Sequence, residues 1–363
     1  MWRRSSVRAE SMQRIGLVVA LMLFAISATA GDIAYVSNQA GGVSRIDPAS
    51  LVMLDSIDLS DSAPRGLAVT PDGKLLLTAN QKTGDVAVID TQSLKIVRRI
   101  PIGKNPEFMR ILPDGSKAFV TYEPGSSGGP PSGNGGKGGN GGHDDDDDVT
   151  PAHVAVIDLH TWTVVASIIG APETEGIEFS VDNKQLVVSN EGDDTLTVYA
   201  TADGKLLRTI NLSTWGHRPR GIKRSPDGKH YVVTLENSNA LLILDTYFQV
   251  VKSVPTGIGP YGVAFDKAGK RIVVAASRGS RLQVFDAETY ASVADIAIGK
   301  RCWHFTFTPD ERRILVACGT SNDVEVIDAV SYQRTTTIPG FNKPWGIVTY
   351  PKANGSLETK TAP

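Results

Sequence analysis

The sequence predicts an all-β fold made of seven similar units, and three observations support this. The phrase TPDGKLLLTANQKTGDVAVIDTQSLKIVRRIPIG at 70–103 recurs with variations along the chain. Each copy holds four short apolar runs separated by turn residues, and no window of ten or more residues has a helical period. The copies begin near Ile33, Leu75, Ala118, Gln185, His230, Arg271 and Arg313, 41–45 residues apart except in the third copy. Together these features predict a seven-bladed β-propeller with four-stranded blades.

Two markers define the units. Pro-Asp-Gly, typical of a type I turn because proline presets φ at the second position, occurs at 71–73, 113–115 and 226–228. An apolar-x-Asp strand ending follows in most copies, as in VAVID at 86–90. Alternate residues of this strand share a face and are apolar, as a strand between two stacked blades requires.

The first copy begins on the second strand of a blade, which predicts how the ring closes. Ile33–Asp58 would supply three outer strands of the last blade, and Lys343–Tyr350 would supply its inner strand. Such pairing of the N-terminal strands with the C-terminal inner strand removes free sheet edges.

The repeat resembles a known one. YVSNQAGGVSRIDPASLVMLDSI at 35–57 is similar to the YVTN repeat, and the resemblance extends over residues 32–351. The last two copies, at 298–348, resemble an exported seven-bladed subgroup associated with alcohol catabolism dependent on pyrroloquinoline quinone. The insertion around 124–150 is a departure from that subgroup.

The N-terminus has the features of a secretory signal peptide over residues 1–30. Four arginines precede an apolar run from Ile15 to Ile26, and Ala28-Thr29-Ala30 has the small-x-small pattern of a cleavage site. The run is too short for a stable membrane anchor, so no transmembrane segment is expected after cleavage. We therefore expect a periplasmic or secreted protein, with the propeller at 31–352 and a flexible tail at 353–363.

Composition restricts the partners. The formal charge is −2, and removal of the leader, with its four Arg and one Glu, makes it −5. A mildly acidic chain without a basic stripe argues against nucleic acid as a partner. Cys302 and Cys318 flank one predicted hairpin, which leaves a disulfide and two buried thiols both open.

The insertion at 124–150 is rich in Gly and carries five consecutive Asp at 144–148. Without apolar periodicity we expect it to be a disordered, solvated acidic linker on the same face as the starts of the inner strands. A divalent cation bound weakly by carboxylates is the second reading, with the metal candidates His143, Asp144, Asp146 and Asp148. A charged loop that docks a partner is the third.

Aligning the copies gives one candidate binding ring. The residue before each inner-strand glycine falls at one rim of the channel, and the next position contributes His304 as a ligand or switch candidate. The rim residues are Arg65, Glu107, Glu175, Arg220, Tyr261, Trp303 and Trp345. Aromatic rings offer stacking area and arginines offer forked donors to carboxylate or phosphate, which suggests a binding mouth. The structural alternative is that the aromatics fill gaps between blades, that His304 is a wall residue, and that Arg110, Glu178 and Lys223 form an ion network below.

The sequence contains no standard catalytic motif. The expected function is that of an exported, non-enzymatic, monomeric propeller that binds a small molecule or protein partner without a cofactor. The resemblance implies a place beside a quinoprotein alcohol-oxidation system. The first alternative is a lactonase-like or other metal-dependent propeller hydrolase, although no Asn or Asp stands beside Glu107, Glu175 and Glu178. The second is a passive cell-envelope structural protein.

Overall fold

The computed structural model describes Met1 and residues 31–124 and 150–360. The predictions for the leader at 1–30, and for His143, Asp144, Asp146 and Asp148, lie outside the described residues. No helix in the part of the chain that is described is long and apolar enough to cross a membrane.

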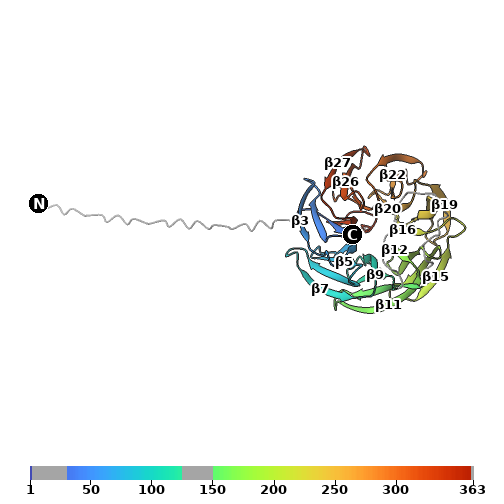
Figure 1. Ribbon diagram of the computed structural model, residues 1–363, viewed down its shortest axis with the longest axis horizontal. Helices are drawn as coiled ribbons and strands as arrows, with labels where there is room; N and C mark the ends of the chain where they lie inside the picture. Colours follow the sequence, from blue (N-terminus) through green and yellow to red (C-terminus); the bar gives the residue numbers. More distant parts are fainter. Residues whose placement is uncertain (2–30, 125–149, 361–363) are drawn as a thin grey trace, which may run out of the picture. The chain divides into compact units, whose positions relative to one another are not determined.

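Seven four-stranded antiparallel sheets surround a central axis, which confirms the predicted seven-bladed β-propeller (Figure 1). Blade 1 contains β4 (Pro64–Val69), β5 (Leu75–Asn80), β6 (Asp85–Asp90) and β7 (Ile96–Pro101). Blade 2 contains β8 (Pro106–Ile111), β9 (Lys117–Tyr122), β10 (Pro151–Asp158) and β11 (Thr163–Pro172). Blade 3 contains β12 (Thr174–Phe179), β13 (Gln185–Asn190), β14 (Thr195–Ala200) and β15 (Leu206–Asn211).

The other blades repeat this order from the axis outward. Blade 4 contains β16 (Pro219–Arg224), β17 (Tyr231–Leu235), β18 (Ala240–Leu244) and β19 (Val250–Pro255), with the 3₁₀ turn η1 (Glu236–Ser238). Blade 5 contains β20 (Pro260–Phe265), β21 (Arg271–Ala276), β22 (Arg281–Asp286) and β23 (Ser292–Ala297). Blade 6 contains β24 (Cys302–Phe307), β25 (Arg313–Cys318), β26 (Asp323–Asp328) and β27 (Arg334–Pro339). Blade 7 contains β28 (Pro344–Tyr350), β1 (Ile33–Asn38), β2 (Val43–Asp47) and β3 (Val52–Ile57).

The repeat phrase of blade 1 shows how the sequence produces these sheets. In the turn between β4 and β5, Asp72 Oδ1 accepts hydrogen bonds from Thr70 Oγ1 at 2.7 Å and from Lys74 N at 3.1 Å. Gly73 follows with φ of 74°, a conformation that glycine adopts without strain. The strand β6 lies between neighbouring blades and is buried on both faces, whereas the outer strand β7 is mostly exposed. In blade 1 the apolar pattern of the strands and the residues of the turn therefore both match the observed structure.

The ring closes as predicted. The strand β1 pairs antiparallel with β28, with Tyr35 opposite Val348. The Ser37 hydroxyl reinforces the joint by accepting a hydrogen bond from Gly346 N at 3.0 Å and donating one to the Arg65 carbonyl at 2.6 Å. The last blade thus combines three N-terminal strands with one C-terminal strand.

The C-terminal segment differs from the flexible tail expected at 353–363. Residues 353–358 are buried, and Leu357 has no exposed surface and packs into the largest core cluster. The segment runs beside the inner strand β24, where Phe307 N donates to the Asn354 carbonyl at 2.8 Å and Ser356 N donates to the Phe305 carbonyl at 2.9 Å. The inner strands of a propeller leave one edge unpaired toward the channel, and here the tail satisfies part of that edge.

The centre of the channel is filled by aromatic side chains. At the inner-strand glycine position, Phe108 and His304 replace glycine, and their rings from blades 2 and 6 are 6.0 Å apart. Glycine at this position lets neighbouring inner strands approach closely, since a Cβ on Gly66 would lie 2.5 Å from the Glu107 carbonyl oxygen. The channel is therefore a packed core and not an open pore.

Candidate functional site

The seven rim residues lie around one cavity of about 100 Å³ where the inner strands begin. Their side chains are well buried, with 2–7% of each residue exposed. His304, the eighth candidate, does not line the cavity. It lies beneath it, with its ring 4.3 Å from that of Trp345 and 5.4 Å from that of Tyr261.

Two further positions of the repeat also supply the cavity, and the sequence reasoning missed both. One is the residue before each inner strand, and the other is the residue after each second strand. The first position contributes Asn105, Glu173, Arg218 and Arg301, and the second contributes Gln39, Glu123, Glu191 and Glu236. The same repeat alignment that gave the rim contains both positions, so the signal was present in the sequence.

The backbone explains why these two positions meet at the mouth. Glu173, Arg218 and Arg301 have φ of 51°, 64° and 54°, in the left-handed region that is unusual for residues other than glycine. Their carbonyls accept hydrogen bonds from the residue after the second strand, as from Glu191 N to the Glu173 carbonyl at 2.8 Å and from Glu236 N to the Arg218 carbonyl at 2.9 Å. The same conformation recurs before other inner strands, at Ala63, Asn105 and Lys343, so it belongs to the turn that leads into each inner strand.

Blades 3 and 4 form a dense ion network. Arg220 donates from Nε to Glu236 at 2.6 Å and from Nη1 to Glu175 at 2.6 Å, and Nη1 also contacts Glu191. Arg218 Nε lies 2.8 Å from the other Glu191 oxygen. Although burial lowers the pKa of Arg220, the surrounding carboxylates raise it well above its usual range. Arg220 is therefore a permanent cation whose Nε and Nη1 groups are engaged by carboxylates.

Tyr261 joins this network to the aromatic side of the mouth. Its hydroxyl donates to Glu175 Oε1 at 3.0 Å, and the Arg220 guanidinium lies 4.7 Å from its ring centroid. Burial, with the Glu175 carboxylate next, raises the pKa of Tyr261, so the phenol stays protonated. The hydroxyl is thus held as a donor to Glu175.

Arg65 occupies the next sector. Its Nη1 contacts Glu107 Oε1, and its buried Nε has no hydrogen-bond partner among the described residues. Burial lowers the pKa of Arg65, while the acids around the cavity counteract this. An unpaired, buried N–H on a cation is a donor available to a ligand oxygen.

Glu123 is the acid of the mouth whose pKa is raised toward neutrality. It is 9% exposed and accepts a hydrogen bond from Asn105 Nδ2 at 2.8 Å, and no ion pair joins it to another residue within 31–124 or 150–360. Burial, followed by the carboxylates of Glu175 and Glu173, raises its pKa to about 7 against the opposing effect of Arg65. A carboxyl group in this condition exchanges protons near neutral pH, as a general base or acid must.

The donors do not suit a metal. Within the described residues, no three or more His, Cys, Asp or Glu side chains form a group that could hold a metal ion. Most of the mouth carboxylates face guanidinium groups instead, and an added cation would compete with these.

Below the mouth, the expected ion network is present in part. Arg110 Nη1 lies 3.3 Å from Glu178 Oε2, and the nearby cations lower the pKa of Glu178 to about 2 despite its burial. Lys223 Nζ is buried and has no hydrogen-bond partner in the described part of the chain. Burial, with Arg110 next, lowers its pKa to about 7. The sequence thus predicted the Arg110–Glu178 pair, but not that Lys223 Nζ would lie 5.6 Å from the centroid of the Phe108 ring without a hydrogen-bond partner among the described residues.

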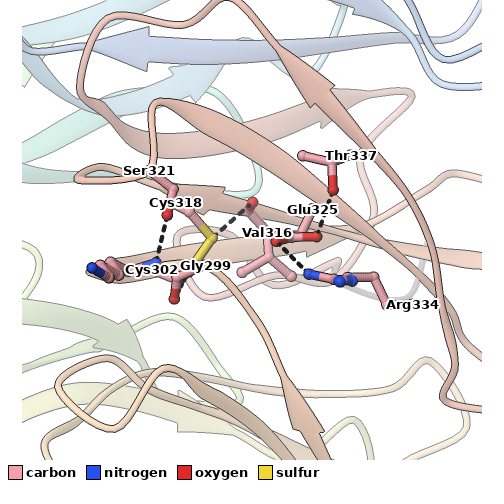
Figure 2. The surroundings of a disulfide bond; sticks show 9 residues. Gly299, Cys302, Val316, Cys318, Ser321, Glu325, Arg334 and Thr337 are labelled. Atoms are coloured by element: carbon pink, nitrogen blue, oxygen red, sulfur yellow. Dashed lines mark hydrogen bonds and ion pairs between the residues drawn. A yellow bond between two sulfur atoms is a disulfide. The ribbon is translucent and has the colours of Figure 1, made fainter.

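A disulfide stands at the mouth, and it resolves the alternative left open for the two cysteines. Cys302 in β24 lies directly opposite Cys318 in β25, and their sulfur atoms are bonded at 2.05 Å (Figure 2). Arg301 and Trp303, the neighbours of Cys302, both line the cavity. Trp303 lies against Gly319, where a Cβ would meet the indole at 1.9 Å. The disulfide therefore links the start of β24, which carries Arg301 and Trp303 next to Cys302, to the end of β25.

Comparison with known proteins gives one family match. Residues 148–246 match the model of the family "Lactonase, 7-bladed beta-propeller". No curated protein matches the chain.

Solved structures share the fold. Two proposed 6-phosphogluconolactonases, from Bacteroides uniformis and Bacteroides fragilis, each have 15% identity and a TM-score of 0.70. The alignments cover 88% and 89% of this chain and 99% of each of theirs. Hydrazine synthase from Kuenenia stuttgartiensis has 22% identity and a TM-score of 0.67, over 82% of this chain and 92% of that one. At such identities these structures are evidence of fold alone.

The expectation of a non-enzymatic binding protein needs correction. The family whose model residues 148–246 match is one of lactonases. This match favours the hydrolase alternative over the binding scaffold. Sequence reasoning underrated that alternative because it examined Glu107, Glu175 and Glu178 and overlooked Glu123.

Proposed function

We propose that the protein is a lactone hydrolase whose active site is the cavity at the channel mouth. The observation that carries the proposal is Glu123, a carboxyl group with a pKa of about 7 in a largely buried cavity that Arg65 also lines. The partial match to the lactonase family supports the same reaction class.

The reaction needs a base for water and a donor for the carbonyl oxygen. As a carboxylate, Glu123 takes a proton from water while the water oxygen bonds to the carbonyl carbon of the lactone. In the proposed reaction Arg65 Nε, which has no hydrogen-bond partner among the described residues, donates to the oxyanion that forms on the carbonyl oxygen. The acyl–oxygen bond of the ring then breaks, and the proton held by Glu123 passes to the departing ring oxygen. Lactone and water thus give one hydroxy acid, and Glu123 returns to its starting state.

The neighbouring residues prepare these two groups. Asn105 Nδ2 bridges Glu123 and Glu107, at 2.8 Å and 3.3 Å, and so links the base to the partner of Arg65. The carboxylates of Glu173 and Glu175 keep the proton affinity of Glu123 high enough for transfer to the ring oxygen. Glu175 and Glu173 therefore contribute to the reaction through the effect of their charge on Glu123.

The test is the pH dependence of lactone ring opening by the wild type and by Glu123→Gln. The wild-type kcat/KM is expected to rise with pH through about 7, because Glu123 must be ionised to act as a base. The variant is expected to lose about 10²- to 10⁴-fold. Glu288→Gln, at an exposed glutamate on the outer part of blade 5, is the matched control and should keep wild-type activity.

A flat wild-type profile between pH 5 and 9, or a Glu123→Gln variant within threefold of the wild type, would contradict the assignment. Activity should also survive prolonged chelation, since the described residues include no group suited to a metal. Loss of activity on chelation that zinc or calcium restores would point instead to the metal-dependent hydrolase.

We further propose that the protein acts outside the cytoplasm, in the periplasm or after secretion. The leader pattern at 1–30 and the Cys302–Cys318 disulfide support this location. The link of the YVTN-like repeat to quinone-dependent alcohol catabolism stays a prediction from resemblance. Fractionation of cells that express the full chain tests the location, and a mature protein that stays in the cytoplasm would contradict it.

A further inference from the structure

The charge and shape of the mouth indicate which lactones it accepts. We propose that it selects a small, uncharged ring ester and discriminates against the phosphorylated form of the same ring. This inference rests on the proposed lactone hydrolysis and concerns the substrate of that site.

The first argument is the sign of the charge. Six glutamates and four arginines line the cavity, which gives a formal charge of −2 when all are ionised. Arg278 approaches Glu236 at 3.0 Å from outside the cavity and brings the total to −1. Protonation of Glu123 would change this formal charge from −1 to zero and would not make it positive. The mouth thus offers no net positive field to a phosphate dianion.

The second argument is that the arginines are already engaged. Arg65 pairs with Glu107, and Arg220 contacts Glu236, Glu175 and Glu191. A phosphate could use these guanidinium groups only by displacing a carboxylate that is itself buried, and an uncompensated buried charge is costly. A single unpaired N–H, such as Arg65 Nε, suits one carbonyl oxygen and not a phosphate.

Arg301 is the exception among the four arginines. No ion pair joins it to another residue in the part of the chain that the structure describes, and it is only partly buried. It lies on blade 6, on the aromatic side of the mouth, and offers one guanidinium in contact with solvent. Its charge is already included in the total above, and an ion pair between a ligand and a partly exposed guanidinium contributes only about 0–1 kcal/mol.

The third argument is the shape of the cavity. Tyr261, Trp303 and Trp345 come from the consecutive blades 5, 6 and 7 and form an aromatic side opposite the charged side of blades 2 to 4. Flat aromatic surfaces suit the C–H face of a small ring. The volume of about 100 Å³ is well below the roughly 300–1,000 Å³ of ordinary ligand clefts. A single five- or six-membered ring matches this space better than a ring that carries a phosphate arm.

The experiment separates selectivity from catalysis by measuring binding of lactams, which have the ring and carbonyl of the lactone but resist hydrolysis. A δ-lactam and the same δ-lactam with a phosphate ester on an exocyclic carbon are titrated into the protein. Trp303 and Trp345 line the cavity, so tryptophan fluorescence reports occupancy. We expect the uncharged lactam to bind at least tenfold more tightly at pH 8 and low salt. Glu173→Gln, which removes one mouth carboxylate, should narrow this preference at least threefold, whereas Glu288→Gln should leave it unchanged.

Equal or tighter binding of the phosphorylated lactam would overturn the inference, and so would failure of both lactams to bind. The corresponding lactones are assayed in parallel. Hydrolysis of the phosphorylated lactone with equal or higher kcat/KM overturns the selectivity but leaves the proposed reaction intact. Binding of the uncharged lactam without hydrolysis of either lactone upholds the selectivity of the mouth and rejects the reaction.

Discussion

Replacing Glu123 by glutamine removes the carboxyl group whose pKa the fold raises most clearly toward neutrality. In the unfolded chain this group has a pKa of about 4.5, and in the folded protein burial and neighbouring carboxylates raise it to about 7. Each tenfold change in proton affinity corresponds to about 1.4 kcal/mol, so the full difference corresponds to about 3 kcal/mol. Ionising Glu123 in the native state therefore costs the wild type about 3 kcal/mol of stability.

The direction in which stability changes with pH depends on whether the folded or the unfolded state binds the Glu123 proton more tightly. The folded protein binds this proton more tightly, so the contribution to stability is complete below about pH 4 and is lost as the pH rises through 4.5 to about 7. Glutamine cannot ionise and keeps the amide link to Asn105 available. Relative to the wild type, Glu123→Gln should thus gain stability between pH 4 and pH 8, by about 3 kcal/mol.

Urea unfolding at pH 4, 6 and 8 measures this difference, with Glu288→Gln as the exposed control. The gain should appear mostly between pH 4 and pH 7 and should be absent from the control. If the free-energy difference between Glu123→Gln and the wild type is the same at pH 4 and pH 8, the carboxyl group titrates normally and the proposed base loses its physical support.

Three further predictions concern the rest of the channel. Lys223→Met should stabilise the protein by about 1–4 kcal/mol at pH 7 in urea unfolding, because the pKa of this unpaired lysine is lowered to about 7; destabilisation would show that Nζ has a partner. Ending the chain at Lys352 should cost at least about 3 kcal/mol, because it removes the buried Leu357, whereas an unchanged melting temperature would mean that the tail is dispensable. Replacing Cys302 and Cys318 by alanine should cost about 2–4 kcal/mol, and reductant should then destabilise the wild type but not the variant.

The blades could be predicted from the sequence because their determinants are local and repeated. The Pro-Asp-Gly turns and the apolar-x-Asp endings each act within a few residues, and seven copies reinforce one another. Ring closure followed from the count, since the first copy lacks an inner strand and residues 343–350 supply one. The alignment also placed Trp303 and Trp345 at the correct end of the channel.

What the sequence did not disclose depends on contacts between distant parts. Residues 353–360 carry no strand pattern, and their burial rests on hydrogen bonds to the free edge of β24. His304 was predicted to lie at the rim, but its ring lies in the centre of the channel, close to the ring of Phe108 from blade 2. Glu123 is visible in the alignment, but its significance comes from a pKa that burial and charged residues of three other blades determine together. Charge coupling of this kind is a property of three-dimensional arrangement and has no sequence motif.

The pairing of β1 with β28 also determines when the molecule becomes complete. Ser37 and Gly346, which meet in this joint, are 309 positions apart in the chain. During synthesis the N-terminal strands emerge first and wait for a partner that is made almost at the end. Trp345 arrives on that same closing strand, so no partly made chain possesses the whole mouth. The cavity at the channel mouth is therefore complete only after the last blade has been assembled.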